Sequence, residues 1–148
     1  MSDRVVTQLY HHAQPFVLKD GAVLPELRIA YETWGELDGS GTNAVLLFHA
    51  LSGSHHVAGW NPDLPEAGDL WQTELHDGWW PEMVGPGKAL DTNKFYVICA
   101  NYLGGCYGST GPSSIHPTTG RPWGSAFPHL TANDLVRAQL ALLDALGI

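Results

Sequence analysis

The sequence predicts half of an open α/β sheet, and two buried strands and one helix are the observations that predict it. Residues 44–48 and 95–100 are short, continuously apolar runs, typical of strands whose two faces are both covered. Residues 131–146 have the spacing of an amphipathic helix. Each strand opens into a loop of small and polar residues. Open α/β sheets place their chemistry at the carboxyl ends of such strands.

The N-terminal segment predicts antiparallel strands beside this sheet. Residues 1–15 are polar, and we expect a loose N-terminal arm there, with the domain itself spanning residues 16–148. Phe16 to Leu18 leads into an Asp-Gly pair at 20–21, which is the signal of a hairpin turn. From Leu27 to Thr33 apolar and polar residues alternate, as in an antiparallel strand with one face on the core.

Two long connections follow the buried strands. Residues 54–94 carry four tryptophans among Pro and Gly, and we expect an ordered excursion packed by its own aromatic residues. Residues 101–128 are rich in Gly, Ser, Thr and Pro and are too long for a plain connection.

The helix has start and stop signals of its own. Thr131 is the expected cap, and Asp134 completes a variant of the capping box. Gly147 supplies the stop. The expected buried stripe has four positions, the last of which has two candidates: Leu135, Ala138, Leu142, and Ala145 or Leu146. A helix followed at once by a single apolar residue, Ile148, suggests a fragment that lacks the next strand.

Composition and charge exclude several classes of function. A net charge of −8 with seven scattered basic residues argues against a nucleic-acid partner. Two cysteines, Cys99 and Cys106, make no disulfide framework and fit a reducing compartment. No apolar run approaches the length of about 18 residues that spans a membrane, and the N-terminus has no signal-peptide core. We expect a cytoplasmic protein without membrane contact.

Five ordered motifs lie between Leu24 and Ile148. They are AYETWGEL at 30–37, NAVLLFHALSG at 43–53, GWW with GPGKALDT at 78–92, NYLGGCYGSTGPSSIHPTTGRPWGSAFP at 101–128 and LLDALGI at 142–148. In these motifs the chain resembles the homoserine O-acetyltransferases, a branch of the α/β-hydrolase superfamily. The resemblance covers about five-sixths of this chain and less than half of a family member.

The resemblance implies both fold and activity. The fold would be the N-terminal half of an α/β-hydrolase, a mostly parallel sheet with an antiparallel N-terminal hairpin, truncated before the nucleophile elbow. The activity would be ping-pong transfer of an acetyl group from acetyl-CoA to L-homoserine through an acyl-serine, a step of methionine biosynthesis. No Gly-x-Ser-x-Gly occurs here, so the serine, acid and histidine of the triad would lie beyond residue 148. Acetyl-CoA would be a co-substrate, with no bound cofactor or metal, and the full-length protein a homodimer.

Two residues of this chain inherit site roles from the resemblance. The backbone N–H of Leu51 would be one oxyanion donor, and Gly53 would help to shape its loop. Ser52 stands where the family commonly has Thr, beside the amino-acid pocket, and its hydroxyl would bind homoserine. Related enzymes use succinyl-CoA or accept L-serine, so acyl donor and acceptor stay open. Taken alone, this chain is expected to be inactive, because it lacks the nucleophile.

Other residues invite rival interpretations. Cys106 lies in Gly-x-Cys-x-Gly, the elbow pattern of a cysteine-dependent lactone hydrolase or esterase, but loop residues follow it where an elbow needs a helix. His49 is expected to be structural rather than a catalytic base. His55-His56 is expected to pack in a loop or at the surface, because adjacent residues seldom converge on one metal ion. A non-catalytic interaction module is a third possibility.

Three further features stay open. Lys88 is expected to be solvated, with a CoA phosphate as the alternative partner. Arg121 has no assigned role. The pair Trp79-Trp80 is expected to pack the excursion rather than to stack on a ligand.

Overall fold

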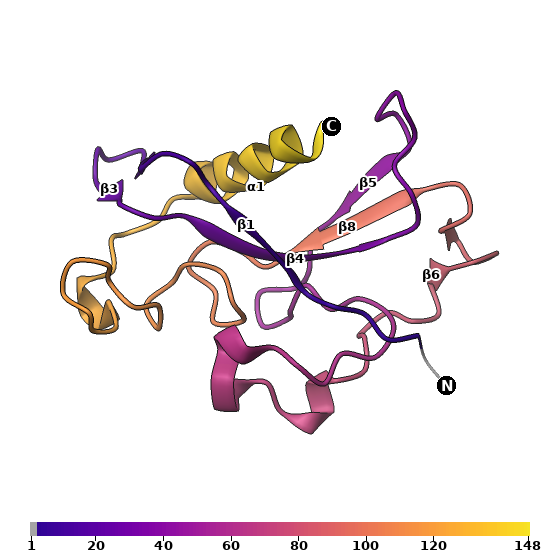
Figure 1. The fold of residues 1–148 in the computed structure, drawn as a ribbon, viewed down its shortest axis with the longest axis horizontal. Helices are drawn as coiled ribbons and strands as arrows, with labels where there is room; N and C mark the ends of the chain where they lie inside the picture. The colour runs from indigo at the N-terminus through magenta and orange to yellow at the C-terminus, as the bar shows by residue number, and fades with distance from the viewer. Residues whose placement is uncertain (1–2) are drawn as a thin grey trace.

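The computed structural model describes residues 3–148, and its centre is a four-stranded sheet (Figure 1). The strand order is β1 (Gln8–His11), β4 (Arg28–Trp34), β8 (Tyr96–Ala100) and β5 (Ala44–Leu47). β4 is antiparallel to β1 and to β8, whereas β5 runs parallel to β8. The two predicted buried strands are therefore parallel neighbours, which confirms the α/β class.

β1 lies in the segment that we expected to be a loose arm. Gln8–His11 pairs along its length with the first half of β4, from Tyr31 back to Arg28. The prediction is wrong for these residues, because so short a strand is stabilised by its partner and its packing rather than by a pattern of its own. Residues 1 and 2 of the expected arm lie outside the described residues.

The predicted hairpin is confirmed as a separate two-stranded sheet of β2 (Phe16–Val17) and β3 (Val23–Leu24). Gly21 adopts a φ of 91° in its turn and donates its N–H to the carbonyl of Leu18 at 3.0 Å. That left-handed backbone favours glycine.

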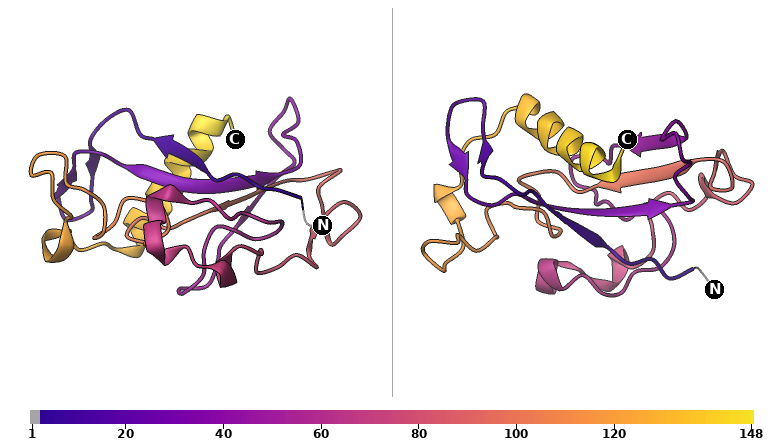
Figure 2. Two further views of the ribbon diagram at one scale, coloured as in Figure 1. Left: turned by 60° about the horizontal axis from the view of Figure 1, so that its bottom comes forward. Right: turned by 45° about the horizontal axis from the view of Figure 1, so that its top comes forward.

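Helix α1 (Ala132–Leu146) covers one face of the sheet (Figure 2). Thr131 and Asp134 form the predicted capping box, and Gly147 ends the helix with a φ of 79°. Ala138 and Leu142 are fully buried in the main core, which they share with Ile29 and Ile98 of the sheet. Of the two candidates for the last apolar position, Leu146 packs against this core and Ala145 is exposed.

The excursion covers the opposite face of the sheet (Figure 2). It contains η1 (Pro65–Leu70), η2 (Thr73–Leu75), β6 (Val84–Gly85) and β7 (Leu90–Asp91), and η3 (Gly124–Ala126) lies in the later loop. Because both faces are covered, β4 is buried from Ile29 through Glu32. The expectation that one face of this strand meets solvent is therefore wrong.

β5 forms one edge of the sheet in the described part of the chain. Its four residues are only half-buried, and Phe48 just after it is 59% exposed. Unpaired strand edges are places where another strand can add. Among residues 3–148 no helix has the length and apolar character needed to cross a membrane.

Candidate functional site

A cavity of about 450 Å³ lies where β5 and β8 end. One wall is the loop after β5 and the other is the Gly-rich loop after β8, with Leu130 and Leu135 closing the helix side. This cavity brings together Leu51, Ser52 and Cys106, which are more than fifty residues apart at the extremes. The carboxyl edge of parallel strands thus carries the cavity, as the sequence predicted.

The loop after β5 is a tight turn that presents backbone donors. The carbonyl of Ala50 accepts the N–H of Gly53 at 2.8 Å, so that Leu51 and Ser52 occupy the tip. The Leu51 side chain is 97% exposed. Within residues 3–148, the N–H groups of Leu51 and Ser52 donate to no acceptor. The turn therefore leaves two backbone donors free at the cavity.

Gly53 lies at a close approach within the turn. A Cβ built on it would lie 3.2 Å from the Ala50 carbonyl oxygen, which is tighter than most contacts, and 3.4 Å from the Cβ of His49, which is an ordinary contact. A side chain here would therefore require the Ala50 carbonyl to shift by a few tenths of an ångström. Glycine avoids that shift.

His49 holds the base of the same loop. Its Nδ1 lies 2.7 Å from the carbonyl of Ala50 and must donate, because a carbonyl only accepts. Its ring stacks on Tyr102 with centroids 4.1 Å apart, and the Tyr102 hydroxyl donates to the His49 carbonyl at 2.7 Å. Burial lowers the pKa of His49, which favours the neutral ring. The contacts support a structural role.

Cys106 is exposed and lines the cavity, but its surroundings differ from an elbow. The chain around it is a series of turns, and the next α-helix begins at Ala132. The loop folds on itself, with the N–H of Gly104 donating to the carbonyl of Thr110 at 2.7 Å. No helix N-terminus follows the thiol, which disfavours a cysteine nucleophile.

A second polar cluster, missed from the sequence, is buried on the face of the sheet that the excursion covers. Glu32 and both His55 and His56 are at most 1% exposed. One oxygen of Glu32 accepts from the Thr7 hydroxyl at 2.9 Å and from the Asn61 amide at 2.7 Å. Its other oxygen lies 2.7 Å from Nδ1 of His56. The histidines pack inside the excursion and not at the surface.

Hydrogen-bond partners fix the protons of this cluster. His56 Nε2 faces the carbonyl of His76 at 3.0 Å and must donate, so a single proton lies between its Nδ1 and Glu32. The Thr7 hydroxyl donates its hydrogen bond to Glu32. Its oxygen can therefore only accept from His55, so His55 Nε2 donates to that oxygen at 2.9 Å. Burial lowers the pKa of His55 to about 4, so this ring is neutral.

No metal centre or ligand platform arises from the remaining expected residues. Among the described residues, no group of three His, Cys, Asp or Glu side chains could hold a metal ion. Lys88 is exposed and donates to the carbonyl of Pro81, and Arg121 is also exposed. Trp79 and Trp80 stack on each other at 5.6 Å and are 42% and 39% exposed. The cavity at the ends of β5 and β8 is lined by none of the four residues Lys88, Arg121, Trp79 and Trp80.

Sequence comparisons find homoserine O-acyltransferases among the relatives of this chain. It is 51% identical over 145 residues to a homoserine O-acetyltransferase of Moorella thermoacetica, and 54% identical over 144 residues to a homoserine O-succinyltransferase of Aromatoleum aromaticum. Each match covers 97% of this chain and 36% of the relative, so the chain spans about a third of their length. The chain matches the N-terminal third of the homoserine O-acyltransferase family. No protein-family model matches it.

Solved structures agree with this assignment. Homoserine O-acetyltransferase from Bacillus anthracis superposes with a TM-score of 0.79 at 30% identity, over 99% of this chain and 38% of that one. Esterase E22 gives the same TM-score at 34% identity, over 97% of this chain and 38% of that one. The fold is therefore the N-terminal portion of an α/β-hydrolase, as the motifs predicted.

Proposed function

We propose that this chain forms one wall of an acyl-transfer site, in a longer protein that moves an acetyl or succinyl group from CoA to the hydroxyl of L-homoserine. The observation that carries the proposal is the turn of residues 50–53. Leu51 and Ser52 line the cavity between the β5 and β8 loops, and their N–H groups donate to no acceptor among residues 3–148. The names of the relatives supply the substrates: of eight similar relatives, seven are homoserine O-succinyltransferases and one is an O-acetyltransferase.

The chemistry needs donors where negative charge develops. Attack on the thioester carbonyl of the acyl donor produces a tetrahedral oxyanion, and the N–H of Leu51 would donate to it. One such donor contributes about 3–4 kcal/mol of transition-state stabilisation. The nucleophile would be a serine in a segment that follows residue 148, and the Ser52 hydroxyl would bind the acceptor amino acid beside the loop.

A chimaera tests this wall directly. Residues 1–148 would be joined to the C-terminal two-thirds of the Moorella thermoacetica relative, and CoA release with homoserine would be measured for acetyl-CoA and succinyl-CoA. Leu51→Pro removes the N–H at the second position of the turn of residues 50–53, a position that proline favours in common β-turns. It also removes the exposed leucine side chain. We expect kcat to fall by about 100- to 1,000-fold.

Leu51→Ala is the matched control. It keeps the N–H and changes a side chain that is 97% exposed, so kcat should stay within about twofold of the parent. Equal losses in the two variants would refute the oxyanion role. The isolated 148 residues are expected to give no turnover. Turnover that Cys106→Ala abolishes would instead establish a cysteine elbow.

An esterase is the second candidate, and the similarity to esterase E22 favours it. Water would replace homoserine as acceptor on the same oxyanion loop. The chimaera separates the two, because an acyltransferase partitions the acyl group to homoserine whereas an esterase releases the free acid. We also propose that the longer protein takes part in methionine biosynthesis, lies in the cytoplasm and forms a homodimer.

A further inference from the structure

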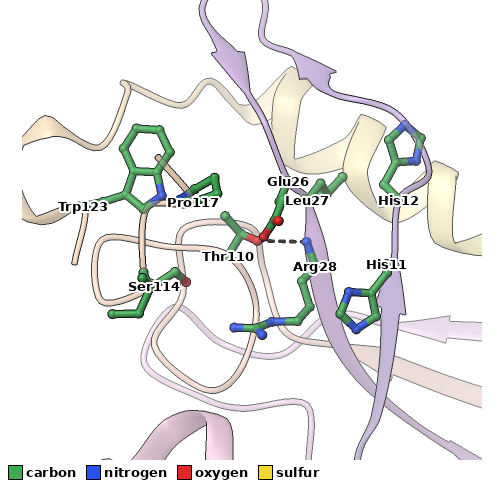
Figure 3. A pocket seen from close by; sticks show the side chains of 10 residues that line it. His11, His12, Glu26, Leu27, Arg28, Thr110, Ser114, Pro117 and Trp123 are labelled. Atoms are coloured by element: carbon green, nitrogen blue, oxygen red, sulfur yellow. Dashed lines mark hydrogen bonds between the residues drawn. The ribbon is translucent and has the colours of Figure 1, made fainter. Parts of the chain in front are cut away.

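A second cavity, of about 660 Å³, lies on the far side of the Gly-rich loop (Figure 3). β1, the start of β4 and the segment 110–123 enclose it, and it shares no lining residue with the acyl-transfer cavity. Its size is within the range of about 300–1,000 Å³ that is usual for small-molecule sites. The proposed function makes no use of this cavity.

Arg28 is the basic group of this cavity that carries a permanent charge, whereas Glu26 is its acidic group, and the Arg28 backbone is clamped. Its N–H donates to the hydroxyl of Thr110 at 2.8 Å, and its carbonyl accepts the N–H of Thr110 at 2.8 Å. The side chain extends from β4 below the loop that carries Thr110 and Ser114 (Figure 3). It also lines an adjoining cavity of about 300 Å³. The Arg28 side chain therefore starts from a clamped backbone and lines both cavities.

The guanidinium lacks a protein partner. Nε of Arg28 is shielded from solvent and has no acceptor, and the side chain forms no ion pair with a described carboxylate. Glu26 lines the larger cavity and Glu66 the adjoining one, but neither forms an ion pair with Arg28 among residues 3–148. A shielded donor left unpaired loses the hydrogen bond that it makes to water in the unfolded chain, and the loss is larger when the donor is charged. An acceptor from outside these residues would remove that cost.

We propose that this cavity binds a small organic oxyanion, a carboxylate or a phosphate monoester, on Arg28. The planar guanidinium matches either group with two parallel hydrogen bonds. The Thr110 hydroxyl accepts from Arg28 but donates to no described acceptor, so its proton is available to the ligand. His11 adds a further polar group, and Trp123 supplies an apolar wall for the carbon skeleton (Figure 3).

Nuclear magnetic resonance of the 148-residue chain tests the site, because its four arginines give few Nε–H signals. Succinate and inorganic phosphate are the probes, and succinamide is the uncharged control with the succinate skeleton. We expect the Nε–H signal of Arg28 and the amide signals of Thr110 and Ser114 to shift and saturate with the charged probes only. The probe that saturates at lower concentration identifies the preferred oxyanion.

Arg28→Gln should weaken binding by at least about tenfold, because it removes a charge-assisted bidentate contact. Arg137→Gln is the matched control, since that arginine lies on α1 and donates to the carbonyl of Val17; it should leave affinity within about twofold. Non-saturating shifts, or shifts that map away from residues 11, 28, 110 and 114, would overturn the proposal. These shifts are measured on the parent chain, so they test the proposed site even if Arg28→Gln fails to fold.

Discussion

Glu32→Ala is expected to lower the free energy of unfolding by about 3–5 kcal/mol, the range measured when one partner of a buried ion pair is removed. The carboxylate is fully buried and receives hydrogen bonds from Thr7 and Asn61 as well as the contact with His56. Alanine leaves these three groups without their acceptor. Each unsatisfied group costs about 1–3 kcal/mol, so three groups would cost about 3–9 kcal/mol, and the expected loss lies at the lower end because Thr7 is only partly buried.

Urea unfolding followed by tryptophan fluorescence measures this loss. Trp71 is a local reporter, because its ring lies 6.0 Å from the rings of both His55 and His56. Glu32→Gln keeps an acceptor for two of the three groups but removes the charge, so it should cost less than alanine. Glu36→Gln, at an exposed glutamate, should stay within about 0.5 kcal/mol of the parent. A loss below about 1 kcal/mol for Glu32→Ala would refute the hydrogen-bond assignment.

Three further predictions concern acid, the core and the helix cap. His55 has a pKa of about 4 in the folded chain against 6.5 as its ordinary value, so the unfolded chain binds the proton more readily. The contribution of His55 to the free energy of unfolding should therefore be complete above about pH 6.5 and fall as the pH drops toward 4. Urea midpoints measured across this range check the prediction. His55→Gln should flatten the dependence of the midpoint on pH. Leu142→Ala should cost about 2–5 kcal/mol in urea unfolding, whereas Leu140→Ala, at a side chain that is 52% exposed, should cost little; similar losses would contradict the assigned helix face. Thr131→Ala should cost about 1 kcal/mol and Thr131→Ser should restore most of it, both read from the thermal midpoint; no loss would mean that the capping box contributes nothing.

The sequence by itself determined the elements whose signals are local. Continuous apolar runs marked β5 and β8. Burial on both faces explains the run of β8, whereas β5 is only half-buried at the edge of the sheet in the described part of the chain. Thr131, Asp134 and Gly147 marked the ends of α1, because capping acts within a few residues. The small residues after β5 marked the tight turn of residues 50–53 for a similar reason, since a turn is a short-range structure.

Only the tertiary structure decided the features that depend on partners far along the chain. β1 forms because β4, some twenty residues later, offers its edge, and no pattern within residues 8–11 records that. Glu32 looked like the polar side of an alternating strand, yet the excursion buries it against His56. Arg28 became a candidate ligand for an oxyanion only when Thr110 clamped its backbone and no carboxylate met its side chain. Strand pairing, side-chain burial and the lack of a partner for a charged group all depend on residues far apart in the sequence. They are therefore decided only when the helix, the sheet and the excursion pack together.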